Sequence, residues 1–108
     1  MTAQTEHELQ TAIIALIRKR GGVATRVNSG NIVNSIRGAS KGTADIIACY
    51  RGRYLAIEVK SSKGKPTIEQ LVFGDNVRMA GGVFFVTWNL ETVNNMLDAL
   101  STGKSIGG

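Results

Sequence analysis

Glu58 and Lys60 lie two residues apart in the apolar segment "YLAIEVK", residues 54–60. In a β-strand, side chains two residues apart project from the same face. Two charged groups on one face of an apolar strand are costly unless each has a partner. The spacing therefore indicates that Glu58 and Lys60 face a specific partner.

Asp45 precedes a second apolar segment, and a tight turn at residues 51–52 joins the two segments. With a two-residue turn, Tyr50 pairs with Arg53, and the same ladder places Asp45 opposite Glu58. A three-residue turn would leave the two carboxylates on a diagonal. In either case they lie close enough to repel each other unless a divalent cation sits between them. Hard oxygen ligands at this spacing suit Mg²⁺, with Mn²⁺ as a substitute.

The first predicted helix, residues 5–20, offers a third carboxylate. Its apolar residues recur at helical spacing: Leu9, Ile13, Leu16 and Ile17. Around the helix axis, Glu6 lies about 20° from Ile13 and Glu8 about 140° from it. We therefore expect Glu6 to point inward and Glu8 to point to solvent.

Lys60 completes this group chemically. Beside a metal and a phosphate, a lysine can hold or help deprotonate an attacking water and can stabilise negative charge on the phosphate. The chain is also basic, with a formal net charge of +5 over 108 residues. Acidic ligands inside a basic protein suit a nucleic-acid backbone as partner, although basicity alone would equally fit an anionic membrane surface.

Length and composition predict one domain over residues 1–100 and a disordered tail at 101–108. Cys49 is the single cysteine, so no intramolecular disulfide is possible, which fits a reducing cytoplasm. The polar N-terminus does not resemble a signal peptide, and no apolar run approaches the length of a membrane span.

Helices and strands alternate in the expected order αβββαβα. This order is typical of an α/β fold with a mixed β-sheet flanked by helices. We expect helices at 5–20, 66–80 and 90–100, and strands at 23–29, 43–50, 53–60 and 83–87. The Gly, Ser and Asn content of residues 29–42 indicates a mobile loop or a ragged hairpin.

These segments together resemble a known nuclease family. "GTAD", twelve intervening residues and "EVK" are similar to the PD-(D/E)xK core, with Gly42-Thr43-Ala44-Asp45 in place of the usual Pro-Asp. The ordered set "E…LQ…I", "RVNSG", "KGTADII", "AIEVKSSKGKPTIEQ" and "GGVFFV" resembles the VRR-NUC branch over residues 5–90. The resemblance implies a restriction-endonuclease-like fold with Lys60 as the catalytic lysine. It also implies a set of metal ligands: Asp45, Glu58, the Val59 carbonyl and Glu6, the last directly or through water.

Further candidates lie around this group. Gln70 matches a glutamine that would face the active site in the family, although Thr67 to Gln70 is also a capping-box pattern with a purely structural role. The candidate DNA contacts are Arg26, Asn28, Lys41, Lys63 and Lys65. For Arg26 and Asn28, phosphate contact and a plain sheet-edge role are both open. Trp88 is expected to pack at a strand end rather than to stack on a base.

We therefore expect a Mg²⁺-dependent endonuclease that hydrolyses DNA phosphodiesters at Holliday junctions or other branched sites, in replication, recombination or repair. A C₂ homodimer would supply two sites for symmetric cutting, and the family resemblance implies a bacterial or phage-infected cell. Neither a membrane nor a small-molecule substrate is expected. The alternatives are a flap-type nuclease, a catalytically idle module that binds branched DNA, and a small structural protein. Taken singly, Asp45 could be a turn residue, and Glu58 with Lys60 an edge-strand ion pair.

Overall fold

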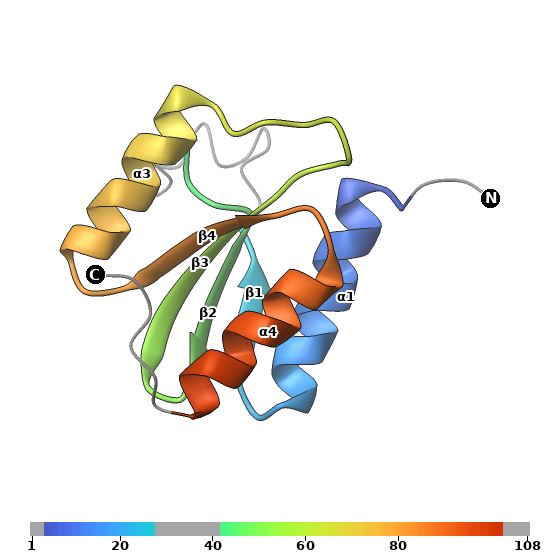
Figure 1. The fold of residues 1–108 in the computed structure, drawn as a ribbon, viewed down its shortest axis with the longest axis vertical. Coiled ribbons are helices and arrows are strands. Elements are labelled where there is room, and N and C mark those ends of the chain that lie inside the picture. The colour runs from blue at the N-terminus through green and yellow to red at the C-terminus, as the bar shows by residue number, and fades with distance from the viewer. Residues whose placement is uncertain (1–3, 28–41, 103–108) are drawn as a thin grey trace.

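The computed structural model describes residues 4–27 and 42–102. The helices are α1 (Glu6–Lys19), α3 (Ile68–Met79) and α4 (Leu90–Ser101). The strands are β1 (Val23–Arg26), β2 (Ile46–Tyr50), β3 (Arg53–Val59) and β4 (Val83–Thr87). The predicted order αβββαβα is confirmed (Figure 1). Asn28, Lys41 and all but the last residue of the segment 29–42 lie outside the described residues, as does the tail from residue 103.

The four strands form one mixed sheet in the order β1-β2-β3-β4. The first three strands are antiparallel, and β3 and β4 are parallel. Tyr50 pairs with Arg53, as predicted for a two-residue turn. Arg51 and Gly52 both have positive φ angles, of 53° and 79°, which suits the primed hairpin turns. Because β3 lies between β2 and β4, the edge-strand explanation for Glu58 and Lys60 is wrong.

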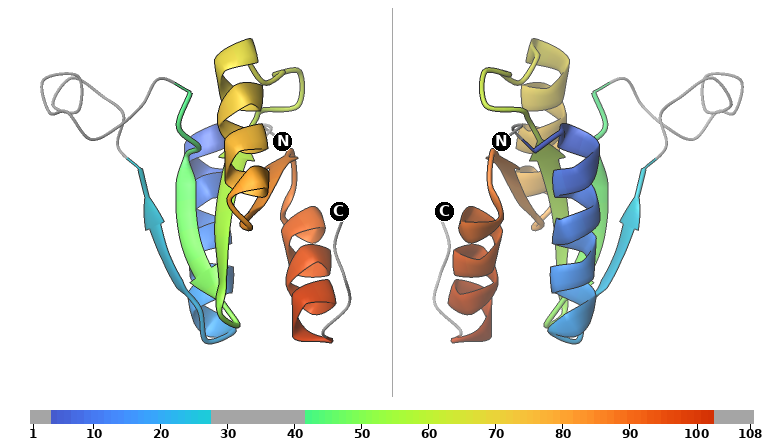
Figure 2. Two further views of the ribbon diagram at one scale, coloured as in Figure 1. Left: turned by 90° about the vertical axis from the view of Figure 1, so that its left-hand side faces the viewer. Right: turned by 90° about the vertical axis from the view of Figure 1, so that its right-hand side faces the viewer.

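Helices cover both faces of the sheet (Figures 1 and 2). Helices α1 and α4 pack with alternate strand side chains such as Leu55 and Ile57 to form the larger core. Helix α3 covers the other face, where Ala56, Val77 and Phe84 form a smaller core. Along β3, Glu58 follows the alternation of Ala56, so its side chain projects on the α3 side.

Glycine allows α3 to lie close to the sheet. A Cβ atom added at Gly74 would lie 2.3 Å from Cδ2 of Phe84, a distance that forces a rearrangement. Helix α3 begins with a capping box in which Thr67 and Gln70 each satisfy the other's backbone N–H group. Its N-terminus is therefore fixed in position next to the end of β3. Within residues 4–27 and 42–102, no helix is both long enough and apolar enough to span a bilayer.

Candidate active site

Asp45 and Glu58 meet at the C-terminal end of β3. The β2–β3 register pairs Ile46 with Ile57, so the next step places Asp45 opposite Glu58, as predicted. The backbone N–H of Val59 donates a hydrogen bond of 2.9 Å to Oδ2 of Asp45. This bond fixes the Asp45 carboxylate beside the last two residues of β3.

Glu58 is almost fully buried, with 1% of its surface exposed. Its Oε2 atom accepts a hydrogen bond from Nε2 of Gln70 at 2.7 Å and forms an ion pair with Nζ of Lys60 at 3.1 Å. Its Oε1 atom is buried and has no hydrogen-bond partner among the described residues. Buried oxygens are normally satisfied. When Glu58 is protonated it can donate to the adjacent Asp45 carboxylate, and when it is ionised Oε1 is free to accept a cation.

The surroundings raise the pKa of Glu58 to about 7. Burial is the largest cause, and the adjacent Asp45 carboxylate is the second. Lys60 acts in the opposite direction and favours the charged form. A divalent cation bound to both carboxylates would remove their mutual repulsion and favour the ionised form of Glu58.

Gln70 forms the predicted capping box and also contacts Glu58, while its catalytic role remains a prediction. Its backbone N–H and side-chain Oε1 take part in the capping box with Thr67, at 3.1 and 2.8 Å. Its Nε2 group remains available and donates to Glu58. One side chain therefore fixes the start of α3 and orients the buried carboxylate.

Glu6 reaches the same end of β3 from the helix on the other face of the sheet. Helix α1 packs on the face opposite to α3, and Oε2 of Glu6 accepts a hydrogen bond of 3.0 Å from the Ser61 backbone, just beyond β3. Among the described residues, no three His, Cys, Asp or Glu side chains form a group that could hold a metal ion. The structure thus brings Asp45 and Glu58 together and places Glu6 at the strand end. Ligation by Glu6 remains a prediction.

The candidate DNA contacts differ in their surroundings. Lys63 and Lys65 are exposed on the loop that follows β3. Arg26 instead joins β1 to α1, because its Nε donates to Oε1 of Gln10 at 2.7 Å and its Nη2 donates to Oγ1 of Thr11 at 2.8 Å. Arg26 therefore has a structural role. Its contact with a DNA phosphate remains a prediction. Asn28 and Lys41 lie outside the described residues.

Gly42 positions Asp45, a role that the sequence does not reveal. Its φ angle is +86°, and a Cβ atom at this position would lie 2.4 Å from the backbone oxygen of Glu69. The segment that leads to Asp45 therefore touches the first turn of α3. A positive φ at Gly42 could be suspected from the glycine, but its contact with α3 depends on the tertiary structure.

Thr87 and Trp88 also support the candidate site, through two contacts that the sequence does not predict. The Thr87 carbonyl accepts a hydrogen bond of 3.0 Å from the Lys60 backbone. The Trp88 indole Nε1 donates to the Gly64 carbonyl at 2.9 Å, which ties the loop after β3 to the end of β4. The motif "EVK" identifies Lys60, but it does not predict that the end of β4 binds the Lys60 backbone.

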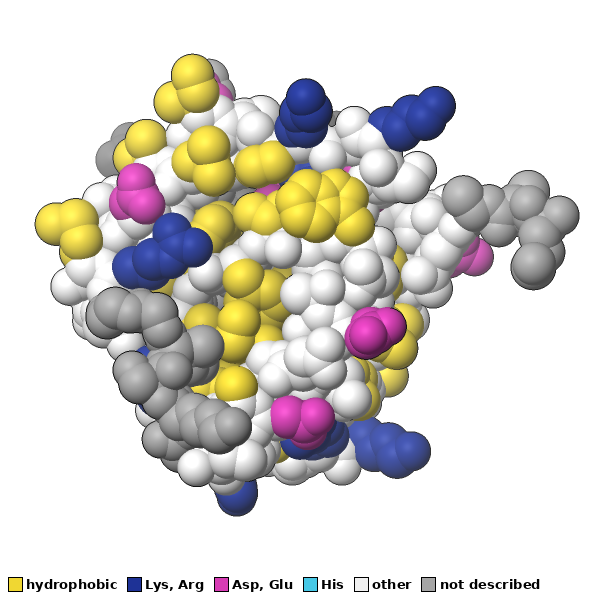
Figure 3. Space-filling view, viewed as in Figure 1, with side chains coloured by type: hydrophobic (Ala, Val, Ile, Leu, Met, Phe, Trp, Pro, Cys, Tyr) yellow, Lys and Arg dark blue, Asp and Glu magenta, His cyan; other side chains and the backbone are white. Residues whose placement is uncertain are grey.

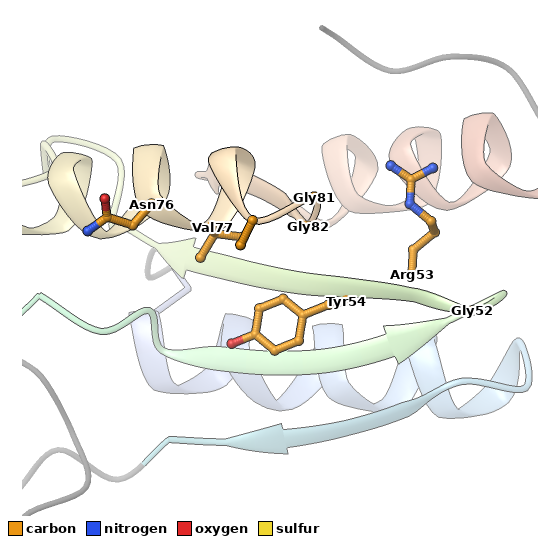
Figure 4. Close-up of a pocket in the computed structure, with 8 residues that line it drawn as sticks. Gly52, Arg53, Tyr54, Asn76, Val77, Gly81 and Gly82 are labelled. Atoms are coloured by element: carbon orange, nitrogen blue, oxygen red, sulfur yellow. The ribbon is translucent and has the colours of Figure 1, made fainter.

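A pocket of 520 Å³ lies at the opposite end of β3 and is not part of this site (Figure 4). Its lining combines the start of β3 with the C-terminal end of α3: Gly52, Arg53, Tyr54, Asn76, Val77, Ala80, Gly81 and Gly82. None of these residues has a carboxylate, imidazole or thiol group. The pocket therefore lacks the carboxylate ligands with which proteins commonly hold Mg²⁺.

The donor set at the end of β3 fits a hard divalent cation. Mg²⁺ retains several waters and is commonly held by one or two protein carboxylates together with substrate phosphates. Asp45 and Glu58 supply such a pair, and the buried, unpartnered Oε1 of Glu58 is available as a ligand. The predicted Val59 carbonyl belongs to the last residue of the same strand.

Comparisons with known proteins identify the fold. The chain is similar to a solved structure described as a "VRR_NUC domain", with a TM-score of 0.69 and 23% identity over 89% of this chain and 97% of that one. A second, described as a "VRR_NUC domain protein", gives a TM-score of 0.66 and 18% identity over 93% and 88%. Comparison with protein-family models finds no match, and neither does comparison with curated proteins. The predicted resemblance is confirmed at the level of the fold.

Proposed function

We propose that this protein is a metal-dependent endonuclease that hydrolyses DNA phosphodiester bonds. The observation that carries this proposal is the buried Glu58 carboxyl beside Asp45, with Lys60 at 3.1 Å and one Glu58 oxygen unpartnered within residues 4–27 and 42–102. Burying two carboxyl groups side by side, with one oxygen unpartnered, costs folding free energy, so stability alone does not explain the arrangement. The VRR_NUC fold supports the same conclusion.

The side chains suggest a division of labour in catalysis. Asp45, Glu58 and the Val59 carbonyl would hold Mg²⁺ or Mn²⁺, and Glu6 would contribute through water. A bound Mg²⁺ supplies charge neutralisation at the phosphate and acidifies the attacking water. Lys60 holds that water or stabilises the negative charge that develops on the phosphate. Gln70 keeps Glu58 in position through its 2.7 Å hydrogen bond.

Branched DNA, such as a Holliday junction, is the substrate we propose. A chain of 108 residues has little room for a module that reads base edges, whereas phosphate contacts can recognise shape. Lys63 and Lys65 lie next to the site and are suited to such contacts. The single cysteine makes a reducing cytoplasm the expected compartment.

We also propose a homodimer, because symmetric cutting of two strands needs two active sites. Helix α3 offers a surface for it, since four of its apolar side chains are exposed (Figure 3): Ile68, Leu71, Val72 and Met79. Asp75 and Arg78 form an ion pair of 3.4 Å on the exposed part of the same helix.

A cleavage assay on matched substrates tests this function. Linear duplex, nicked duplex, flap and four-way junction would each be incubated with wild-type protein and Mg²⁺, Mn²⁺ or EDTA. We expect cutting in Mg²⁺ and Mn²⁺, none in EDTA, and the highest rate on the junction. Preference for the flap would identify a flap-type nuclease. Binding without cleavage in either metal would favour the idle binding module.

A further inference from the structure

Trp88 presents a fixed aromatic ring to solvent. It follows β4 directly, and 44% of its surface is exposed, so the expected packing at the strand end is only partial. The only polar atom of the indole, Nε1, donates to the Gly64 carbonyl at 2.9 Å. The ring is therefore held in one orientation while much of it remains uncovered.

This ring lies at the same end of the sheet as Lys60. Strands β3 and β4 are parallel and pair Val59 with Thr87, so their next residues, Lys60 and Trp88, leave the sheet together. Gly64 links the two side chains, because it accepts the indole hydrogen bond and packs against Lys60. A Cβ atom at Gly64 would lie 3.3 Å from Cβ of Lys60. Trp88 is therefore adjacent to the candidate active site.

Two lysines flank Gly64, the hydrogen-bond partner of the ring. Lys63 and Lys65 lie on either side of Gly64, and both are exposed. Within residues 4–27 and 42–102, neither forms an ion pair. A rigid aromatic side chain next to free lysines is the combination with which proteins bind single-stranded nucleic acid, through base stacking and phosphate contacts.

We propose that Trp88 is a stacking platform for an unpaired base of a nucleic-acid strand, with Lys63 and Lys65 bound to the neighbouring phosphates. This inference rests on the proposed function in one respect, namely that the strand enters the carboxylate site. A base in a continuous duplex has both faces covered by its neighbours, whereas a branch point or a flap exposes one. Trp88 would thus select for DNA with unpaired bases.

Charge distinguishes this occupant from a protein partner. An apolar protein surface that covered Trp88 would also bury Lys63 and Lys65 without counter-charges, which is costly. A phosphate backbone supplies the counter-charges together with the base. Nucleic acid is therefore favoured over a second copy of this chain at this position.

Fluorescence provides a direct test, because Trp88 is the only tryptophan of the chain. Wild-type protein in EDTA would be titrated with an oligothymidylate and with a blunt duplex of the same length. We expect the single strand to quench the emission and the bound duplex to leave it nearly unchanged. Equal quenching by both, or none by either when binding is shown by anisotropy, would overturn the proposal. Emission that changes with protein concentration alone would instead identify self-association.

Two variants separate stacking from the hydrogen bond to Gly64. Trp88→Phe retains a ring that can stack but cannot donate to Gly64, whereas Trp88→Ala loses both properties. We expect Trp88→Ala to weaken single-strand binding by roughly 5- to 150-fold, the range for one stacked base, and Trp88→Phe to weaken it much less. Equal losses in both variants would contradict stacking. Circular dichroism would verify that both variants fold. If a variant does not fold, the fluorescence titration of the wild-type protein still tests the proposal.

The outcome is separable from that of the proposed function. Binding in EDTA does not depend on cleavage, so quenching by a protein that cuts no DNA would support stacking and reject the nuclease. Cleavage by a protein whose emission is unaffected by bound single-stranded DNA would support the nuclease and reject stacking by Trp88.

Discussion

At the scale of single residues, Glu58 balances opposing interactions around one buried carboxyl group. Burial and the negative charge of Asp45 disfavour ionisation, and Lys60 favours it, with a resulting pKa of about 7. The hydrogen bond from Gln70 uses one oxygen and leaves the other without a partner among the described residues. A group with this pKa changes its charge near neutral pH, and in the proposed function it would exchange that proton for a metal ion.

This balance predicts how stability depends on pH in the absence of metal. The pKa of Glu58 rises from 4.5 to about 7 on folding, so between these values the folded state binds more protons than the unfolded state. The contribution of protonated Glu58 to the free energy of unfolding is fully present below pH 4.5 and is lost as the pH rises through 7. Wild type should therefore lose stability relative to Glu58→Gln across this window in urea unfolding with EDTA. Parallel pH profiles for the two proteins would contradict the assignment.

At the scale of elements, Gly42 and the start of α3 bring residues from separate segments together. The contact of Gly42 with the backbone of Glu69 places Asp45 and Gln70 on the same side of β3. The β2–β3 turn sets the register, and the capping box sets the position of Gln70. The candidate active site thus depends on a backbone contact that leaves no room for a side chain at Gly42.

Gly42→Ala should consequently disrupt the site. The added methyl group would lie 2.4 Å from a backbone oxygen, and the φ angle of +86° is unfavourable for alanine, so Asp45 must move. We expect a large fall in the cleavage rate and a loss of about 1–3 kcal/mol in the free energy of unfolding. Gly21→Ala is a matched control, because it has a similar φ of +93° and no heavy atom within 4 Å. Equal rates for the two variants would argue against the role of Gly42.

The sequence predicts this architecture because its signals are local. Alternating strands and a two-residue turn are enough to place Asp45 opposite Glu58. Glu6 shows the limit of such signals. Its angle to Ile13 shows that it faces inward, but not which face of the sheet α1 covers, and the structure places α1 opposite to α3. Similarly, the exposure of Trp88 depends on how the loop after β3 packs, which no local pattern specifies.

At the scale of the whole molecule, the site and the apolar surface of α3 occupy one face of the sheet. Met79 is 85% exposed and Ile68 79%, which is unusual for apolar side chains on one helix. The net charge of +5 favours a polyanionic partner, such as the nucleic acid proposed above. Dimerisation through α3 would cover these side chains.

Val72→Glu tests that arrangement. The substitution places a charge within the exposed apolar group of α3, where Val72 is 52% exposed, so it should convert a dimer to a monomer with little effect on folding. Light scattering coupled to size exclusion would measure the mass of each species. Asn95→Glu, which adds the same charge on an exposed position of α4, should remain dimeric. A wild-type protein that is monomeric at all concentrations would exclude the dimer.

Single-turnover cleavage of the preferred DNA by wild type and Lys60→Ala, at saturating Mg²⁺, tests the central claim most directly. Lys19→Ala, an exposed lysine at the end of α1, is the control for charge. We predict that Lys60→Ala lowers the rate by at least about 100-fold, a typical effect of losing a general acid or base, while affinity measured in Ca²⁺ changes little. If Lys60→Ala cuts as fast as Lys19→Ala, then Lys60, Glu58 and Asp45 do not form the catalytic centre.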